Sequence, residues 1–344
     1  MKKIIVTGIT GQDGSHMVDY LLKNTEHKIY GTVRRLSVKN HENILHLENE
    51  SRFKLIDMDL NDAHSMRDVV IDIQPDYFIN FAAQSFVAGS WNYPIQTWET
   101  DSNSVLHVLE SIRRFSPHCR FYNAGSSEEF GDVICTPQNE DHPLRPQSPY
   151  GAAKCAARHI VRVYRESYGL YSVQGWLFNH EGTRRGLDFV TRKISNTIAK
   201  IKISLESNKE FEPLRMGNVE AKRDWSDAED FMEGVWLMLN QSSPKNYVLA
   251  SGEMHTVREF LDQTLFFAGI KYKKSGEFEN EKYYTEDGQL IFEVDPKFFR
   301  PAEVHKLCGD PSLAESELGW KRKTDFKSLV KKMYENDYNL LCNK

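Results

Sequence analysis

The chain has 344 residues, 40% of them hydrophobic, so it can bury a full core in one large or two modest domains. Its formal net charge of -5 is small and its Lys and Arg residues are spread along the chain, which argues against a nucleic-acid partner. Five cysteines, without a C-x-x-C pair, argue against a disulfide framework and a zinc site, and no apolar run approaches the ~18 residues that span a bilayer. We therefore expect no metal, no membrane partner and a cytoplasmic location.

Short apolar segments alternate with helix-like stretches through the first half of the chain. The pattern predicts strands at 3–7, 29–33, 53–56, 77–81, 120–123 and 171–178, and helices such as 105–115 and 150–167. Such alternation is typical of an α/β fold with a doubly wound parallel sheet and helices on both faces.

The pattern becomes less regular after residue 178, and a last helix is expected at 325–339. This change predicts two parts. The first is a sheet domain at 1–178, to which 227–268 returns. The second is a smaller C-terminal lobe for substrate, built from 179–226 and 269–344.

Three glycines stand between the first strand and the first helix. Gly8, Gly11 and Gly14 would let the backbone approach a pyrophosphate, while the N-terminus of the helix expected at 16–22 supplies N–H groups and a positive dipole. Gln12 and Asp13 of the same turn are expected cofactor contacts. The spacing differs from G-x-G-x-x-G, so a purely structural turn is the alternative. Its position directly after the first strand favours dinucleotide binding.

The ends of the next two strands bear on the choice of cofactor. Arg34 and Arg35 stand where an NAD enzyme would carry an acid for the ribose hydroxyls. Two arginines favour the 2′-phosphate of NADP, unless they form only a solvated basic turn. Asp59 and Leu60 follow the third strand and could contact the adenine, although an acid there is also a common cap.

Tyr150 and Lys154 are four residues apart in a predicted helix, which places both side chains on one face. To act as a base near neutrality, the phenol needs its pKa lowered from about 10 to near 7, roughly 4 kcal/mol. Coulomb attraction over ~4 Å at an effective dielectric constant of ~20 supplies about that much. Alone, the pair would be read as an ordinary helix surface pair, but with the glycine turn it predicts a catalytic base.

A hydroxyl and two carboxylates follow the fifth strand, at the edge of the sheet where ligands of such folds bind. Ser126 could hydrogen-bond the same substrate oxygen as the tyrosine, and Glu128 could act as general acid or base on a neighbouring carbon. The alternative is that the serine only satisfies turn amides. We expect Glu129 to be solvated, because adjacent side chains in a strand-like loop point to opposite sides.

The chain resembles the GDP-mannose 4,6-dehydratase family over nearly its whole length. The segments that carry the resemblance are 7–14, 34–35, 126–131, 150–154, 179–181, 184–186, 189–193, 217–218, 222–225 and 300–304. The resemblance implies a Rossmann-type domain that holds NADP, a smaller lobe that grips GDP, and a homo-oligomer, either tetramer or dimer.

The resemblance also implies roles for individual residues. Ser126 takes the place of the family's catalytic threonine, Glu128 of its glutamate, and Tyr150 with Lys154 of its base pair. Further cofactor contacts are implied for Ala83, Gln84, Ser85, His180 and Arg185. Substrate contacts are implied for Ser126, Glu128, Ser85, Asn179, Lys193, Arg215, Asn218, Arg223, Arg300 and Glu303. The basic members of this set have the charge that a pyrophosphate requires, with solvated surface cations as the alternative.

The departures from the family pattern concern the sugar more than the nucleotide. Phe86 replaces a histidine, Trp91 a phenylalanine and Gln96 a tyrosine, and Gly182-Thr183 replaces Ser-Pro. The loop at 125–131 also resembles that of GDP-4-keto-6-deoxymannose reductases. The expected activity is an NADP-dependent lyase that dehydrates GDP-mannose or a close GDP-manno-sugar. A GDP-manno-heptose dehydratase, a GDP-4-keto-sugar reductase or epimerase, and an NADP-binding sensor without turnover stay open.

Overall fold

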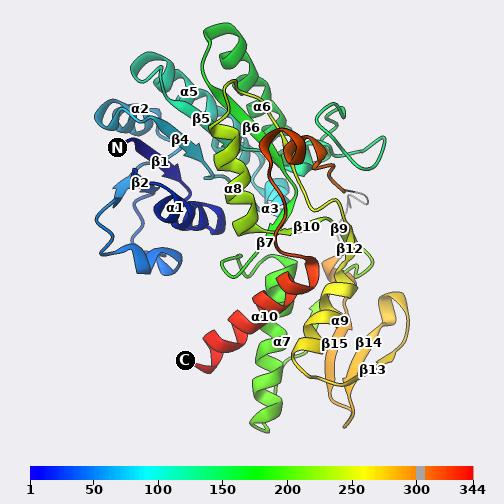
Figure 1. Ribbon diagram of the computed structural model, residues 1–344. Coiled ribbons are helices and arrows are strands. Elements are labelled where there is room, and N and C mark those ends of the chain that lie inside the picture. The colour runs from blue at the N-terminus through cyan, green and yellow to red at the C-terminus, as the bar shows by residue number, and fades with distance from the viewer. Residues whose placement is uncertain (300–306, 344) are drawn as a thin grey trace.

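The computed structural model describes residues 1–299 and 307–343, and its largest element is a seven-stranded parallel sheet (Figure 1). The strand order is β11-β6-β5-β4-β1-β2-β3. The strands are β1 (Lys3–Thr7), β2 (Lys28–Val33), β3 (Phe53–Asp57), β4 (Tyr77–Asn80), β5 (Arg120–Ala124), β6 (Ser172–Leu177) and β11 (Val248–Leu249). The order reverses between β1 and β4, which opens a crevice at the carboxyl ends of these strands where α/β sheets bind ligands.

Helices cover both faces of this sheet, as the alternating pattern predicted. Ile4 and Val6 of β1 pack into one core, and Ile5 between them packs into the other, because successive side chains of a strand face opposite sides. One core includes α1 (Gln12–Asn24) and α8 (Ala228–Leu239), and the other includes α2 (Ala63–Ile73), α5 (Ser104–Phe115) and α6 (Pro149–Tyr168). The molecule therefore has the α/β doubly wound architecture expected from the sequence.

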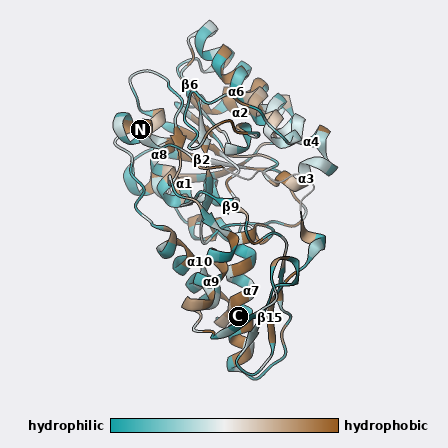
Figure 2. Cartoon of the chain, turned by 90° about the vertical axis from the view of Figure 1, so that its right-hand side faces the viewer, coloured by the Kyte–Doolittle hydropathy of each residue, from teal (hydrophilic) through white to brown (hydrophobic). Residues whose placement is uncertain are grey.

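The smaller lobe packs three helices beside a four-stranded sheet, and lies below the parallel sheet in the side view of Figure 2. Its helices are α7 (Val190–Glu206), α9 (Val257–Phe267) and α10 (Phe326–Cys342). Its strands, in sheet order, are β13 (Tyr272–Ser275), β14 (Lys282–Thr285), β15 (Leu290–Val294) and β8 (Leu214–Met216). The short pairs β7 (Asn179–Glu181) with β10 (Trp225–Asp227) and β9 (Lys222–Arg223) with β12 (His255–Thr256) complete the sheets.

The packing differs from the predicted division of the chain at two places. Phe260 and Leu265 of α9 lie in the core of the smaller lobe, although 227–268 was expected to return to the sheet domain. Conversely, Trp320 lies in the core beside α1 and α8, and its Nε1 donates a hydrogen bond to the carbonyl of Asp230 at 2.8 Å. Apolar spacing identifies a buried segment but not the core that it joins, which explains both errors.

Two further properties of residues 1–299 and 307–343 concern membrane insertion and metal binding. No helix in these ranges is both long and apolar enough to cross a membrane. Nor do these ranges bring three or more His, Cys, Asp or Glu side chains together as a metal site.

Candidate active site

A cavity of about 1010 Å³ opens at the carboxyl ends of β1 to β4. Most residues predicted to bind a dinucleotide line it. These are Gly8, Gly11, Gln12, Asp13, Gly14, Arg34, Arg35, Asp59, Leu60, Ala83, Gln84, Ser85 and Arg185. Residues from the smaller lobe, including Gly186 and Phe189, close one side of the cavity.

Backbone atoms form the floor of this cavity at the glycine turn. Gly8 has a φ of +67°, and a Cβ there would lie 2.8 Å from the amide nitrogen of Ala82. A Cβ on Gly14 would lie 2.4 Å from the carbonyl oxygen of Gly8. The α1 helix starts at Gln12 without a side-chain cap, and the buried Oε1 of Gln12 has no hydrogen-bond partner. A helix N-terminus and an unpartnered polar atom fit a dinucleotide pyrophosphate.

An ion pair stands behind the glycine turn. The Oδ2 atom of Asp13 lies 3.0 Å from Nε2 of His180, and Nε2 of Gln12 donates to the carbonyl of His180 at 3.0 Å. Burial alone would raise the pKa of Asp13, but His180 and Arg185 lower it well below its usual range. Burial would lower the pKa of His180, but Asp13 raises it. His180 therefore fixes Asp13 from behind the cavity wall instead of lining the cavity itself.

The two arginines after β2 are exposed where they line the cavity, and Lys39 and His41 join them. This wall is basic, as a 2′-phosphate requires. Asp59 serves a turn as well as the cavity, because its Oδ1 accepts the backbone N–H of Asn61 at 2.9 Å.

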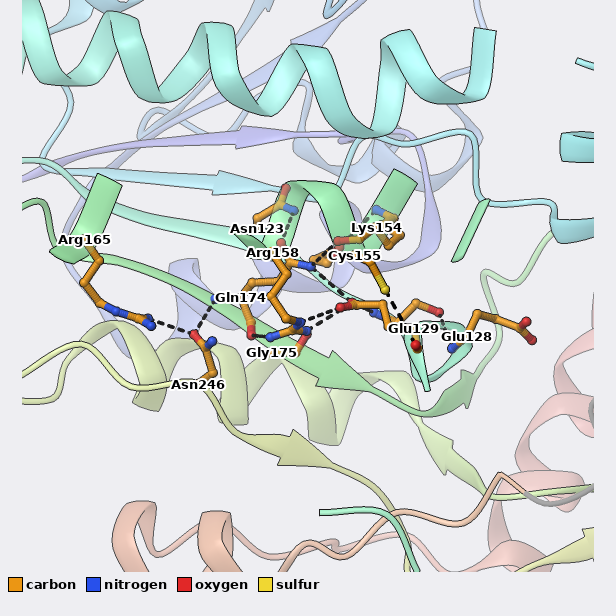
Figure 3. Close-up of polar contacts among 12 residues, drawn as sticks. Asn123, Glu128, Glu129, Lys154, Cys155, Arg158, Arg165, Gln174, Gly175 and Asn246 are labelled. Atoms are coloured by element: carbon orange, nitrogen blue, oxygen red, sulfur yellow. Dashed lines mark hydrogen bonds and ion pairs between the residues drawn. The ribbon is translucent and has the colours of Figure 1, made fainter. Parts of the chain in front are cut away.

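Ser126 starts a short 3₁₀ turn, η3 (Ser127–Glu129), directly after β5. Its hydroxyl accepts the N–H of Glu128 at 3.2 Å, and Oε1 of Glu129 accepts the N–H of Ser126 at 2.8 Å. Glu129 is fully buried and ion-paired with Arg158, so the expectation that it is solvated was wrong. The turn is helical, and its capping box draws the Glu129 carboxylate inward to the N–H of Ser126, while Figure 3 shows Glu128 directed away from the Glu129–Arg158 pair.

Tyr150 and Lys154 lie on the first turns of α6, which Ser148 caps through the N–H of Gly151 at 3.0 Å. Ser126 stands close enough to the Tyr150 hydroxyl to lower the pKa of the phenol. Lys154 places its Nζ 5.6 Å from the centre of the tyrosine ring and donates to the carbonyl of Ala124 at 3.0 Å. The structure thus brings three of the predicted catalytic residues together, with Glu128 on the same turn as Ser126.

The electrostatics of Tyr150 differ from the expectation. Burial raises the pKa of its phenol well above the usual value, Asp101 raises it further, and Ser126 lowers it. Asp101 is itself buried, accepts the N–H of Gln84 at 2.7 Å, and has its pKa raised to about 6 by burial against the pull of Lys154. The positive charge of Lys154 thus acts on Asp101, and lowering the phenol's pKa to neutrality requires a further positive group.

Of the predicted substrate residues, Ser85 lines the cavity, whereas Lys193, Arg215, Asn218 and Arg223 do not. Lys193 donates to the carbonyl of Arg215 at 2.7 Å and stands 4.1 Å from the ring centre of Phe298. Arg215 in turn is ion-paired with Glu293 at 2.8 Å. Burial lowers the pKa of Lys193.

The other substrate predictions have mixed positions. Asn179 begins β7, Asn218 accepts the N–H of Glu220 at 2.9 Å, and Arg223 donates to the carbonyl of Lys222 at 2.8 Å. Arg300 and Glu303 lie outside the described residues.

Several site residues escaped the sequence reasoning. Asp101 and Gln174 carry no local signal, since the chain brings them to the site only through the sheet topology. Arg158 had a signal that was not used: it follows Lys154 by four residues and Tyr150 by eight, on one face of one helix.

Residues 5–333 match the family model described as GDP-mannose 4,6 dehydratase. The chain belongs to the GDP-mannose 4,6-dehydratase family. It is 41% identical to GDP-mannose 4,6 dehydratase 1 of Arabidopsis thaliana, over 98% of this chain and 90% of the relative. It is 39% identical to the Homo sapiens GDP-mannose 4,6 dehydratase, over 98% and 91%.

Solved structures with lower identity share the fold. A UDP-glucose 4-epimerase of Thermotoga maritima with UDP-glucose gives a TM-score of 0.81 at 21% identity, covering 99% of this chain and 100% of that one. A dTDP-glucose 4,6-dehydratase of Bacillus anthracis in complex with NAD gives 0.79 at 18% identity, covering 98% and 96%.

Proposed function

We propose that this member of the GDP-mannose 4,6-dehydratase family converts GDP-mannose, or a close GDP-manno-sugar, to its 4-keto-6-deoxy product. The observation that carries the proposal is the contact of Ser126, Tyr150 and Lys154 at the sheet edge beside the dinucleotide cavity, with Glu128 on the same turn. An alcohol oxidation needs the first three groups, and loss of water from the neighbouring carbons needs an additional acid and base.

We infer that NADP is the cofactor, supported by Arg34 and Arg35 on the cavity wall. A nicotinamide bound here would supply the hydride acceptor and donor for the sugar, and its positive charge would add to that of Lys154. The glycine turn would hold its pyrophosphate.

The chain's own residues then have separate tasks. Tyr150 takes the proton of the C4 hydroxyl while Ser126 holds the same oxygen. The resulting ketone acidifies the C5 hydrogen. Glu128 removes that proton and delivers a proton to the C6 hydroxyl, which leaves as water. When hydride is added at C6, C5 takes up a proton, which balances the one that Tyr150 removed from the C4 hydroxyl. Basic residues of the smaller lobe, Lys193 and Arg223 among them, would bind the GDP diphosphate.

The Glu128→Gln variant tests this division of labour. We expect it to retain C4 oxidation and to lose water elimination by about 10²–10⁴-fold, the range of general acid–base catalysis. Mass spectrometry of the GDP-sugar pool measures the loss of one water. The matched control is Glu140→Gln, because the Glu140 carboxylate accepts the backbone N–H of Val248 in β11. Normal dehydration by Glu128→Gln would show that another residue is the base.

The substrate itself needs a separate comparison. Phe86 is half-exposed and packs edge-on against Phe189, which lines the cavity, so an apolar pair stands where the two lobes meet. This pair supports GDP-manno-heptose, with one more carbon beyond C6, as the second candidate. Incubation with each sugar separately decides between them. Stoichiometric NADPH consumption would indicate a reductase instead, since a dehydratase shows none.

We also propose that the chain forms a homo-oligomer. Leu106 and Phe115 of α5, with Val163 and Tyr168 of α6, are exposed apolar side chains on two helices that pack together. Light scattering of the purified protein should give twice or four times the mass of one chain. A monomer at micromolar concentration would contradict this proposal.

A further inference from the structure

A fully buried ion pair lies under the catalytic turn. Glu129 and Arg158 are 0% and 4% exposed, and both guanidinium Nε and Nη2 bond to the carboxylate, with Nη2 at 3.0 Å from Oε1. The guanidinium also donates to the carbonyl of Gln174 at 2.7 Å (Figure 3). It stacks on the ring of Trp176 at 3.5 Å. Both charges are thus satisfied by side chains and backbone alone.

The carboxylate of Glu129 connects the two halves of the catalytic site. Its Oε1 accepts the N–H of Ser126 at 2.8 Å and Nε2 of Gln174 at 3.1 Å. The same Nε2 donates to the backbone carbonyl of Lys154 at 3.1 Å. One cluster therefore holds the backbone of the Ser126 turn and the backbone of the helix that carries Tyr150.

The close packing of this cluster depends on a glycine. A Cβ on Gly125 would lie 2.7 Å from both Nη2 of Arg158 and Oε1 of Glu129. A side chain at this position would separate the turn from the pair. The Glu129–Arg158 pair therefore packs directly against the turn, with no space for a side chain at residue 125.

The cluster also continues across the sheet to the cofactor side. Asn123 donates to Gln174 at 2.7 Å, Asn80 donates to Asn123 at 2.8 Å, and Thr7 donates to Asn80 at 2.6 Å. Thr7 is the last residue of β1, directly before Gly8. A row of buried hydrogen bonds thus spans β6, β5, β4 and β1.

Stability alone does not account for such a pair. Removing two charges from water is costly, and apolar residues of similar volume often stabilise a protein equally well or better. Displacement of reacting groups by about 1 Å, in contrast, can lower turnover by about 10²-fold.

We propose that Glu129 and Arg158 are positioning residues, which set the distance between the Ser126–Glu128 turn and the Tyr150–Lys154 helix. They act through these residues and contact no substrate. The expected loss of turnover rests on the proposed dehydratase function, whereas the expected change in the backbone of the turn does not.

The double variant Glu129→Leu/Arg158→Leu removes both charges together. We expect a stable fold with NADPH binding unchanged, a turnover of GDP-mannose about 10–100-fold lower, and a KM changed by less than about 3-fold. Backbone amide exchange at residues 126–130 should become at least about 10-fold faster, because the carboxylate no longer holds the turn. The single variant Glu129→Gln should lower the Tm, since it leaves Arg158 unpaired.

A second buried pair provides the matched control. Arg258 and Glu281 join α9 to the strands of the smaller lobe, and Glu281 is buried. Glu281→Leu/Arg258→Leu should leave turnover and exchange at 126–130 unchanged. The proposal is overturned if the Glu129/Arg158 double variant folds with wild-type kcat and wild-type exchange at 126–130. A wild-type chain inactive on every GDP-sugar would refute the proposed function, while the exchange measurement would still judge the pair.

Discussion

At the glycine turn, backbone atoms approach the cavity and little depends on side chains, since Gly8 and Gly14 leave the space where a Cβ would stand. At the catalytic turn, the opposite holds: side chains of η3, α6 and β6 meet in a dry cluster around Glu129 and Arg158. The first region is shaped by a local stretch of chain. The second depends on residues that are distant in sequence, so its geometry is a property of the whole sheet.

The Tyr150→Phe variant should show the largest effect, confined to the catalytic region. We expect turnover to fall by about 10³-fold or more, because the variant lacks the hydroxyl that takes the proton of the C4 hydroxyl. NADPH binding, measured by fluorescence titration, should not change. Tyr164→Phe on the same helix, where the hydroxyl bonds Glu110 at 3.0 Å, is the control. Turnover above a tenth of wild type would exclude Tyr150 as the base.

The Arg34→Ala/Arg35→Ala variant should affect only the cofactor region. Loss of charge-assisted hydrogen bonds to a 2′-phosphate, about 1.5–3 kcal/mol each, should weaken NADPH binding by about 100-fold and leave NADH binding unchanged. Titration with both cofactors measures this difference. Arg67→Ala, an exposed residue paired with Asp68, should change neither affinity. Equal weakening for NADPH and NADH would mean that the arginines do not read the 2′-phosphate.

Two glycine substitutions separate backbone strain from close approach. Gly8 and Gly169 both have a φ of +67°, but a Cβ on Gly169 meets no atom within 4 Å. Gly169→Ala should cost only the left-handed strain, about 1–2 kcal/mol. Gly8→Ala should cost about 1–3 kcal/mol more through its contact with Ala82, and should also weaken NADPH binding. Urea unfolding compares the two variants. Equal losses in the free energy of unfolding would show that the backbone at Gly8 moves away from Ala82 without cost.

Asp101→Asn should have a smaller effect than Gly8→Ala, and it touches both regions. The folded pKa of Asp101, about 6, lies above the ordinary value of 3.8, so the folded state binds more protons between these values. Its contribution to stability therefore falls as the pH rises from about 4 to 6. Replacement by Asn should raise the free energy of unfolding at pH 8 by up to about 3 kcal/mol and have little effect near pH 4.

Urea unfolding at both pH values measures the effect of Asp101→Asn. The exposed Asp141→Asn is the control. A gain in stability of equal size at pH 4 and pH 8 would contradict the assigned titration.

The sequence was most informative where a signal is local. The glycine turn at Gly8 and the arginines after β2 were located from neighbouring residues, and both line one cavity. Tyr150 and Lys154 were located in the same way, and both lie on the first turns of α6. The period of apolar residues also predicted helices on both faces of a parallel sheet, which the two cores confirm.

The errors concern contacts between distant segments. Glu129 was expected in solvent because a strand-like loop was assumed, but the capping box of η3 turns it inward toward a helix 29 residues on. The lowering of the Tyr150 pKa by Lys154 was overestimated, because nothing local places Asp101 against the same two side chains. Such partners are set by packing and not by spacing.

Trp320 has a practical consequence for anyone dividing this molecule. Its indole is buried beside α8, where it bonds the carbonyl of Asp230, 90 residues earlier in the chain. The helix that follows it, α10, belongs to the smaller lobe. A fragment ending before this tryptophan would expose a large apolar socket beside α8, and a fragment containing it would carry a helix without its partners. Neither half is therefore an autonomous module, and swapping lobes between relatives would require at least three junctions instead of one.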